Sequence, residues 1–468
     1  MQFNSLQFLI FLPLVFGAYW AANRHLRLQN LLIVLASYVF YGWWDWRFLI
    51  LIAFTSGWAY LFGLLPRSKW NVAVSLVINL GILGFFKYYN FFVDSLVALI
   101  PGLSESVWTL KIVLPVGISF YTFQALSYTI DVYRGGIVPT KDPIAFFAFI
   151  SFFPQLVAGP IERATNLLPQ FLKSRRFDYP LAVEGCRQML WGFAKKVLVA
   201  DNCALAVNTI LQYADMTTIP AWVGMVCFAF QIYCDFSGYS DIAIGCSKLF
   251  GIRLMKNFDH PYFARDIAEF WRRWHISLTT WFRDYLYIPL GGSRCGKLKK
   301  IRNTFVIFLV SGLWHGADWT FLFWGFVHAV FFIPLLLLGK NRKHVGNVAA
   351  EGRLLPTVRE AVQMIVTFLL VVIGWTFFRA ENISQAFAWL DKMLLHVDFA
   401  VQKGGGLALG AKGLLFAAVL LIVEWFNRDR AIPRLPRSAA LRFFIYCLLA
   451  WCIFFWCPEA QTFIYFQF

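Results

Sequence analysis

One histidine stands where two apolar segments meet. Residues 313–316 read Leu-Trp-His-Gly, and basic clusters close both ends of the apolar stretch around them. If both clusters stay on one side of a membrane, the chain must enter the membrane and return. From Asn303 to Trp314 a helix rises roughly 18 Å at about 1.5 Å per residue, and a hydrocarbon core is about 30 Å thick. We therefore expect His315 to lie inside the membrane, where an ionisable group is a candidate functional residue.

The chemistry that suits this position is proton transfer. Neutral imidazole takes up a proton near neutral pH better than other side chains. The alternative is a structural role, in which His315 forms a hydrogen bond between helices. The neighbours favour the functional interpretation, because Gly316 allows the chain to turn and Trp314 and Trp319 would form a dry aromatic wall.

A second histidine, His275, lies in residues 266–285. Asp266 with Glu269 resembles a capping box, which predicts a helix start. Apolar residues then recur at helical spacing and would form one face of a helix, with arginines on the rest of its surface. Its residues are Trp271, Trp274, Leu278, Trp281 and Phe282. The pattern predicts an interfacial amphipathic helix that faces lipid.

The same segment could instead line a pocket, with Arg272 and Arg273 near phosphate groups. His275 lies on or near the aromatic face, close to Trp271 and Trp274, so we expect it to be buried and to add a second polar group to the site.

Carboxylates also occur in the apolar region 231–241, at Asp235 and Asp241 with Ser237 between them. A carboxylate at the centre of a membrane costs roughly 2.5–3.5 kcal/mol if it faces lipid. These side chains must therefore face protein or water. They would form either a polar tunnel wall or pairs with Ser and Tyr hydroxyls on neighbouring helices.

Two loops carry Gly and Pro. Residues 154–163 suggest a chain break that lines a cavity or a simple interfacial turn. Residues 287–294 contain Gly-Gly-Ser-Arg, which would suit a phosphate, but the spacing is not that of a P-loop and a plain loop is the better interpretation. The sequence has neither a Gly-x-Ser-x-Gly nor a His-Glu-x-x-His motif, so hydrolase and zinc-protease functions have no support.

The composition is that of an integral membrane protein, with 59% hydrophobic and 14% charged residues. We expect an all-α, polytopic helical bundle of about 10–12 transmembrane helices with re-entrant and interfacial helices, forming a single domain over residues 1–468. The net charge of +17 sits in short Lys and Arg clusters between apolar runs, which fits membrane topology rather than nucleic-acid binding. The nine cysteines show no Cys-x-x-Cys pair, so we expect no disulfide framework and no metal site.

The apolar runs of the sequence are the predicted membrane spans. For residues 171–196 we expect a cytoplasmic loop followed by an interfacial helix. The runs are residues 3–20, 31–44, 47–65, 71–86, 91–100, 112–130, 144–157, 197–211, 221–233, 241–250, 361–377, 414–426 and 443–456. Between residues 233 and 241 we expect a turn at Gly238.

Taken together, these motifs resemble the membrane-bound O-acyltransferase family, and within it the alginate O-acetyltransferase-like branch. The matching stretches are residues 114–124, 153–161, 233–241, 270–278 and 312–316. The resemblance covers nearly the whole chain, and these motifs follow one another in the expected order. The resemblance implies transfer of an acyl group from a cytoplasmic thioester toward an acceptor on the outer side. It also implies that His315 is catalytic and His275 assists, and that periplasmic partner proteins acetylate an exopolysaccharide.

The hypothesis is an acetyl-CoA-dependent O-acyltransferase of a bacterial inner membrane, with no permanently bound cofactor. His315 would be the general base, and His275 would orient or polarise the reacting carbonyl. Coenzyme A would contact Arg272, Arg273 and Trp274, and the tunnel would be lined by Asp235, Ser237, Asp241 and Trp314. The expected partners are membrane lipid, periplasmic acetyltransferase proteins and a polysaccharide acceptor, with no nucleic acid.

Two other classes stay open at this point. A transporter or pore would use the buried His and Asp as a proton relay. A scaffold subunit of a polysaccharide synthase would function without either histidine. The acceptor glycan and the acyl chain length are also open.

Overall fold

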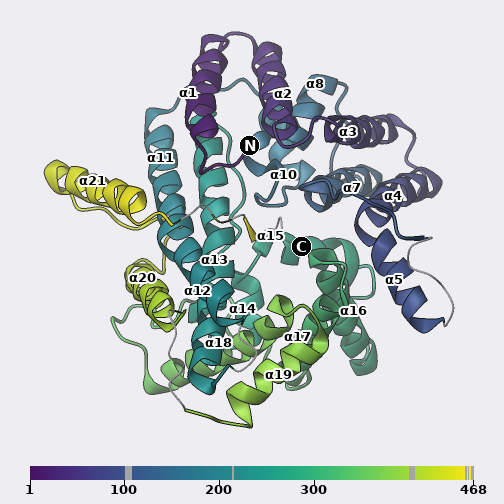
Figure 1. Cartoon of the computed structure of the whole chain (residues 1–468). Coiled ribbons are helices and arrows are strands. Elements are labelled where there is room, and N and C mark those ends of the chain that lie inside the picture. The colour runs from purple at the N-terminus through teal and green to yellow at the C-terminus, as the bar shows by residue number, and fades with distance from the viewer. Residues whose placement is uncertain (101–107, 213–215, 400–405, 459–460, 462, 465–468) are drawn as a thin grey trace. The chain divides into compact units, whose positions relative to one another are not determined.

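The structure, a computed structural model, describes residues 1–100, 108–212, 216–399, 406–458, 461 and 463–464. Within these residues every regular element is helical, which confirms the all-α prediction (Figure 1). Five of the described helices are long and apolar enough to cross a membrane: Lys69–Leu99, Thr218–Leu249, Trp319–Leu337, Val358–Arg379 and Gly406–Phe426. Shorter apolar helices are Leu6–Ala21, Leu26–Gly42, Phe48–Leu64 and Ala439–Phe455. The chain is a multi-pass membrane protein; the count of 10–12 spans stays a prediction.

The chain forms two compact units. One comprises Met1–Met189 with Ile242–Met255, and the other Leu190–Asp241 with Lys256–Phe468. The prediction of one functional domain over residues 1–468 remains a prediction.

The first unit holds the amino-terminal helices. They are α1 (Leu6–Ala21), α2 (Leu26–Gly42), α3 (Phe48–Leu64), α4 (Lys69–Leu83), η1 (Gly84–Tyr88), α5 (Tyr89–Leu99), α7 (Ile118–Arg134), α8 (Pro143–Ser151), α9 (Phe153–Leu156), α10 (Ala164–Phe171) and most of α11 (Tyr179–Ala194). Helix α2 packs on α8, and α3 and α4 pack on α7. The segment from Phe153 to Arg163 is buried throughout, so the Pro and Gly residues of this predicted break lie in a packed interior.

The second unit holds both histidines discussed above. Its elements are η2 (Lys195–Ala200), α12 (Asp201–Ile210), most of α13 (Thr218–Leu249), η3 (Pro261–Phe263), α14 (Ile267–Arg273), α15 (Ile276–Phe282), η4 (Arg283–Tyr287), α16 (Lys297–His315), α17 (Trp319–Leu337), α18 (Val358–Arg379), α19 (Ile383–Leu394), α20 (Gly406–Phe426) and α21 (Ala439–Phe455).

The predicted turn at Gly238 was wrong, because α13 runs unbroken through this position. A Cβ atom added at Gly238 would lie 2.8 Å from the carbonyl oxygen of Gly192 on α11. The glycine is therefore needed for close approach of two helices, which in a sequence looks the same as a turn.

The prediction of one continuous amphipathic helix over residues 266–285 was also wrong. Helix α14 ends at Arg273, and α15 begins at Ile276 after His275, whose φ is +43°. Asp266 caps α14 by accepting from the Glu269 N–H at 2.7 Å, as the capping motif predicted.

The apolar face of this segment is buried in the protein rather than laid on lipid. Its members are Trp271, Trp274, Leu278, Trp281 and Phe282, each less than 9% exposed. The segment thus belongs to the core of the protein. The break between α14 and α15 can therefore direct the His275 side chain into the interior.

The stretch around His315 is a helical hairpin, as predicted. Helix α16 ends at His315, and α17 begins at Trp319. A Cβ atom at Gly312 would lie 2.2 Å from the Phe321 carbonyl oxygen, and one at Gly325 would lie 2.3 Å from that of Phe308. Only glycine allows the two backbones to meet this closely, so these two residues fix the position of His315.

Candidate active site

The two histidines come together in the second unit. His275 precedes α15 and His315 ends α16, and their ring centroids are 6.1 Å apart. The side chains are 1% and 4% exposed. The ring of Trp314 lies 5.6 Å from His275 and 5.0 Å from His315, so it contacts both.

Other aromatic rings complete the enclosure. Trp324 lies 5.2 Å and Phe378 5.4 Å from His315, and Phe236 lies 4.6 Å from His275. This confirms the prediction that both histidines are buried. Both histidine side chains are thus shielded from solvent, which strengthens the electrostatic interactions that they make.

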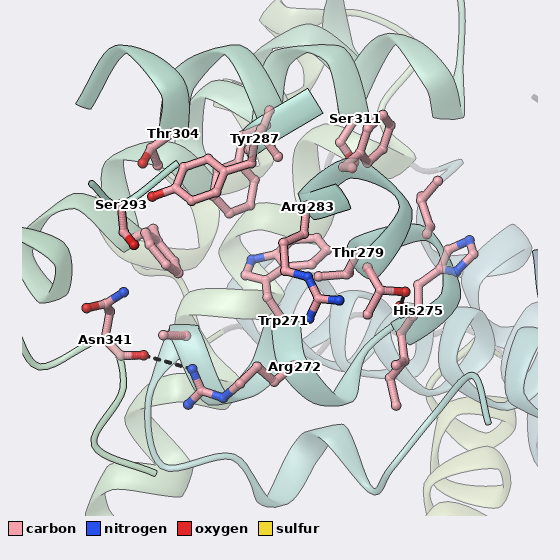
Figure 2. Close-up of a pocket in the computed structure, with 18 of the residues that line it drawn as sticks. Trp271, Arg272, His275, Thr279, Arg283, Tyr287, Ser293, Thr304, Ser311 and Asn341 are labelled. Carbon is pink, nitrogen blue, oxygen red and sulfur yellow. Dashed lines mark hydrogen bonds between the residues drawn. The ribbon is translucent and has the colours of Figure 1, made fainter. Parts of the chain in front are cut away.

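Both histidines line a cavity of about 650 Å³. Figure 2 shows His275 on the side of this cavity opposite Ser293 and Asn341. Hydroxyl groups in the lining come from Thr279, Thr280, Tyr287, Ser293, Thr304 and Ser311. The charged side chains in this lining are all arginines, namely Arg272, Arg283 and Arg342. The cavity therefore combines proton-transfer groups with a positive potential.

His275 is held as a neutral base. Its Nδ1 lies 3.2 Å from Asn257 Oδ1, and its Nε2 is buried with no hydrogen-bond partner in the structure. Burial lowers the pKa of His275, which lies outside the candidate spans, to about 3. The imidazole is therefore uncharged at neutral pH.

The three arginines of the cavity differ in their contacts. Arg272 donates to the carbonyl oxygens of Asn341 at 2.8 Å and His344 at 3.2 Å, as Figure 2 shows for Asn341. Arg342 donates to Ser293 Oγ at 3.3 Å, and Arg283 pairs with the neighbouring Asp284 at 2.7 Å. Arg272 thus anchors the loop that carries Arg342. Arg283 and Arg342 pair with the half-buried Asp284 and the exposed Ser293, near the protein surface, and can turn toward a ligand.

Arg273 and Trp274, which the sequence suggested for cofactor binding, are not among the residues that line this cavity. Arg273 pairs with Glu269 at 2.9 Å and donates to the Asn347 carbonyl oxygen at 3.0 Å. Trp274 packs on Trp375 with ring centroids 5.0 Å apart. Both hold α14 in place, and their contact with a donor stays a prediction.

The carboxylates of α13 lie in a buried ion-pair network outside this lining. Lys195 pairs with Asp241 at 3.1 Å and Lys196 with Asp235 at 2.7 Å. Glu424 and Asp201 complete the network, at 3.2 Å from Lys195 and 2.8 Å from Lys196. These lysines belong to a segment that we had expected to be interfacial. The tunnel role of Asp235, Ser237 and Asp241 remains a prediction.

Sequence reasoning missed Ser311, Arg342 and Asn257 as contributors to the site. Ser311 lines the cavity one helical turn before His315, and a spacing of four residues would have revealed it. Ser293 also lines the cavity, from the Gly-Gly-Ser segment that was considered for phosphate binding and interpreted as a plain loop. Arg342 reaches the cavity from another loop, and Asn257 reaches His275 from a distant part of the chain. No local pattern marks these long-range contacts.

Comparison with known proteins identifies the family of this chain. The profile of the membrane-bound O-acyltransferase family matches residues 137–349, which contain both histidines. The chain is 43% identical to the probable alginate O-acetylase AlgI of Pseudomonas aeruginosa, over 94% of this chain and 85% of the relative. It is 34% identical to the peptidoglycan O-acetyltransferase of Helicobacter pylori, over 84% of this chain and 79% of the relative. It is 28% identical to the teichoic acid D-alanyltransferase of Streptococcus thermophilus, over 56% of this chain and 67% of the relative.

This chain belongs to the membrane-bound O-acyltransferase family. Its activity is that of an O-acyltransferase. Within the family it falls in the alginate O-acetylase branch, with which it shares nearly its whole length.

Proposed function

We propose that this protein moves an acetyl group from cytoplasmic acetyl-CoA to hydroxyl groups of a secreted polysaccharide, in a bacterial inner membrane and with periplasmic partner proteins. The observation that carries the proposal is the pair of buried histidine rings, 6.1 Å apart, at a cavity whose charged lining is arginine.

The arginines support an anionic donor. Coenzyme A carries phosphate groups beyond a long, largely uncharged arm that ends in the thioester. Arg283 and Arg342 would hold the phosphates, since arginine binds phosphate through paired hydrogen bonds. The cavity of about 650 Å³ can accommodate the arm and bring the thioester to the histidines.

The histidines support transfer of the acetyl group from the thioester to an acceptor hydroxyl, which belongs to the polymer or to a partner protein that passes the acetyl group on. His315 removes the proton as the acceptor oxygen attacks the thioester carbonyl carbon, forming a tetrahedral intermediate. The carbon–sulfur bond then breaks, and the proton passes from His315 to the departing thiolate, which leaves as the free thiol of coenzyme A. General base catalysis typically contributes about 10²–10⁴-fold. The hydroxyls of Ser311 and Thr279 in the lining are candidates to stabilise the oxyanion.

The relatives support a glycan acceptor. Their names refer to alginate and peptidoglycan as substrates of O-acetylation and to teichoic acid as a substrate of D-alanylation. Each is a polymer of the cell surface. An acyl group drawn from the cytoplasm must therefore cross the membrane, and partner proteins outside would deliver it to the polymer.

A reconstitution experiment tests the proposal against the transporter and scaffold alternatives. Purified protein is placed in liposomes without an ion gradient, with acetyl-CoA supplied on one side. Alginate oligomers, peptidoglycan fragments and a periplasmic extract are enclosed on the other side as acceptors. We expect free coenzyme A on the donor side and an equal amount of acetyl ester on the acceptor side.

A transporter would leave the thioester intact or require an ion gradient. A scaffold subunit would release no coenzyme A with any acceptor. Either result, from protein that elutes as a single folded species, would overturn the proposal.

A further inference from the structure

We infer that Asn257 is a positioning residue for catalysis: it fixes the Nδ1–H tautomer of His275, which leaves the Nε2 of this cavity-lining histidine unprotonated and able to accept a hydrogen bond. The inference rests on the proposed function for its activity test, and a spectroscopic test is independent of that function.

The hydrogen bonds of the Asn257 side chain define its orientation. The main-chain N–H of Ser277 donates to Asn257 Oδ1 at 3.3 Å, and Ser277 Oγ lies 2.8 Å from the same oxygen. On the other side, Asn257 Nδ2 donates to Ser240 Oγ at 3.1 Å. Rotating the amide by half a turn would place its NH₂ group against a main-chain N–H, so that two donors would face each other. The oxygen must therefore point toward Ser277.

The same oxygen faces His275. Its distance to Nδ1 is 3.2 Å, and a carbonyl oxygen can only accept, so Nδ1 must carry the proton. A neutral imidazole has one N–H, which leaves Nε2 unprotonated. Nε2 is buried and has no partner in the structure, and His275 lines the cavity whereas Asn257 does not.

Asn257 also holds the unusual backbone of His275. The Ile276 N–H donates to the Asn257 main-chain oxygen at 2.8 Å, directly after the positive φ of +43° at His275. A left-handed conformation in a residue other than glycine is strained and persists only where neighbours enforce it. One residue therefore fixes both the backbone and the ring of His275.

Water cannot replace these bonds. Asn257 is 1%, Ser277 0% and Ser240 2% exposed. An imidazole whose Nδ1 lost its acceptor in this interior would be free to move its proton to Nε2, and Nε2 could then no longer accept a proton.

The tautomer limits what His275 can do in the reaction. An unprotonated Nε2 can accept the hydrogen of an attacking hydroxyl, but it cannot donate to the carbonyl oxygen of the thioester. His275 therefore acts on the hydroxyl side of the reaction, together with His315. Polarising the carbonyl falls to other donors of the lining.

Three variants test the role through activity. Asn257→Ala removes the acceptor, and we expect kcat to fall roughly 100-fold, the lower end of the contribution of a positioned acid–base group. Asn257→Asp keeps an acceptor oxygen, so we expect kcat within about tenfold of the wild type. Its carboxylate favours protonated His275, and the acid limb of the pH–rate profile should move to higher pH. Asn79→Ala, the matched control, removes an equally buried asparagine, 1% exposed, that belongs to the other unit and does not line the cavity, and it should leave kcat and the profile unchanged.

Equal losses in Asn257→Ala and Asn257→Asp with an unshifted profile would mean that Asn257 is merely structural, and would overturn the inference. Full activity in Asn257→Ala would overturn it as well. A wild-type protein that transfers no acetyl group would instead overturn the proposed function, and the inference would then stand or fall on spectroscopy.

The spectroscopic test uses protein labelled with ¹⁵N-histidine. The signals of His275 are identified by their loss in His275→Gln. At pH 7 we expect a protonated Nδ1 and an unprotonated Nε2 in the wild type, and a mixture of tautomers in Asn257→Ala. A protonated Nε2 in the wild type would overturn the inference whatever the activity.

Discussion

The ring of His275 lies 6.1 Å from that of His315, centroid to centroid, although His275 lies between α14 and α15 and His315 ends α16. Two structural features bring the two rings together. The break between α14 and α15 places His275 inside the protein, and the glycine contacts of the α16–α17 hairpin place His315 beside it. The contribution of each feature can be tested separately.

The hairpin should not tolerate a methyl group at Gly312. A Cβ atom there would lie 2.2 Å from the Phe321 carbonyl oxygen, so Gly312→Ala should separate the two helices and displace His315. We expect at least a tenfold loss of kcat and a lower midpoint of thermal unfolding in detergent. Gly296→Ala, before the same helix, has no atom within 4 Å of the added carbon and should behave like the wild type. Equal activity of both variants would contradict this account of the hairpin.

The arginines should act on binding rather than on chemistry. Removing the guanidinium in Arg342→Ala should raise KM for acetyl-CoA roughly tenfold and leave kcat nearly unchanged, because a hydrogen bond to a charged group is worth about 1.5–3 kcal/mol. The uncharged donor acetyl-pantetheine should show no difference between the variant and the wild type.

A suitable control for the loss of positive charge is Arg434→Ala, since Arg434 is exposed and pairs with Asp429 at 2.8 Å. If Arg342→Ala lowers kcat for both donors, the arginine does not serve the phosphate groups.

The buried ion pairs should determine stability. Asp241→Asn leaves Lys195 with Glu424 alone, and breaking a buried pair typically costs about 3–5 kcal/mol. We expect a clearly lower unfolding midpoint with kcat of the remaining folded protein close to that of the wild type. Asp429→Asn, at an exposed ion pair, should change neither quantity. The reverse outcome, normal stability with a large loss of kcat, would favour a tunnel role for Asp241.

Acid should destabilise the protein through His275. The pKa of this residue is about 3 when folded, against about 6.5 in an unfolded chain, so the unfolded state binds more protons between these values. Stability therefore decreases as the pH falls below about 6.5, and by pH 5 the loss is about 2 kcal/mol.

The measurement is the unfolding midpoint at pH 7 and at pH 5 in wild type and His275→Gln. The variant should lose less stability between the two values than the wild type does. The exposed His396, replaced by Gln, provides the control. An identical pH dependence in wild type and His275→Gln would show that His275 is not held neutral by burial.

Local sequence patterns predicted the parts of the site that depend on one segment. The burial of His315 follows from its place at the end of an apolar stretch, and the cap at Asp266 from its spacing to Glu269. The same patterns failed where a distant residue decides the structure. Periodicity predicted an unbroken helix through His275, whereas Asn257 enforces a break there. Gly238 suggested a turn, whereas the backbone at Gly192 requires a small residue on a straight helix.

The central claim, that the two histidines work as one catalytic unit, is tested most directly by a double-mutant cycle on acetyl transfer from acetyl-CoA. His315→Ala should lower kcat about 10²–10⁴-fold, His275→Ala by a similar order, and the double variant by no more than the larger single loss. His396→Ala serves as the matched control. Losses that multiply in the double variant would show that the histidines act independently, and full activity of His315→Ala in folded protein would contradict the account.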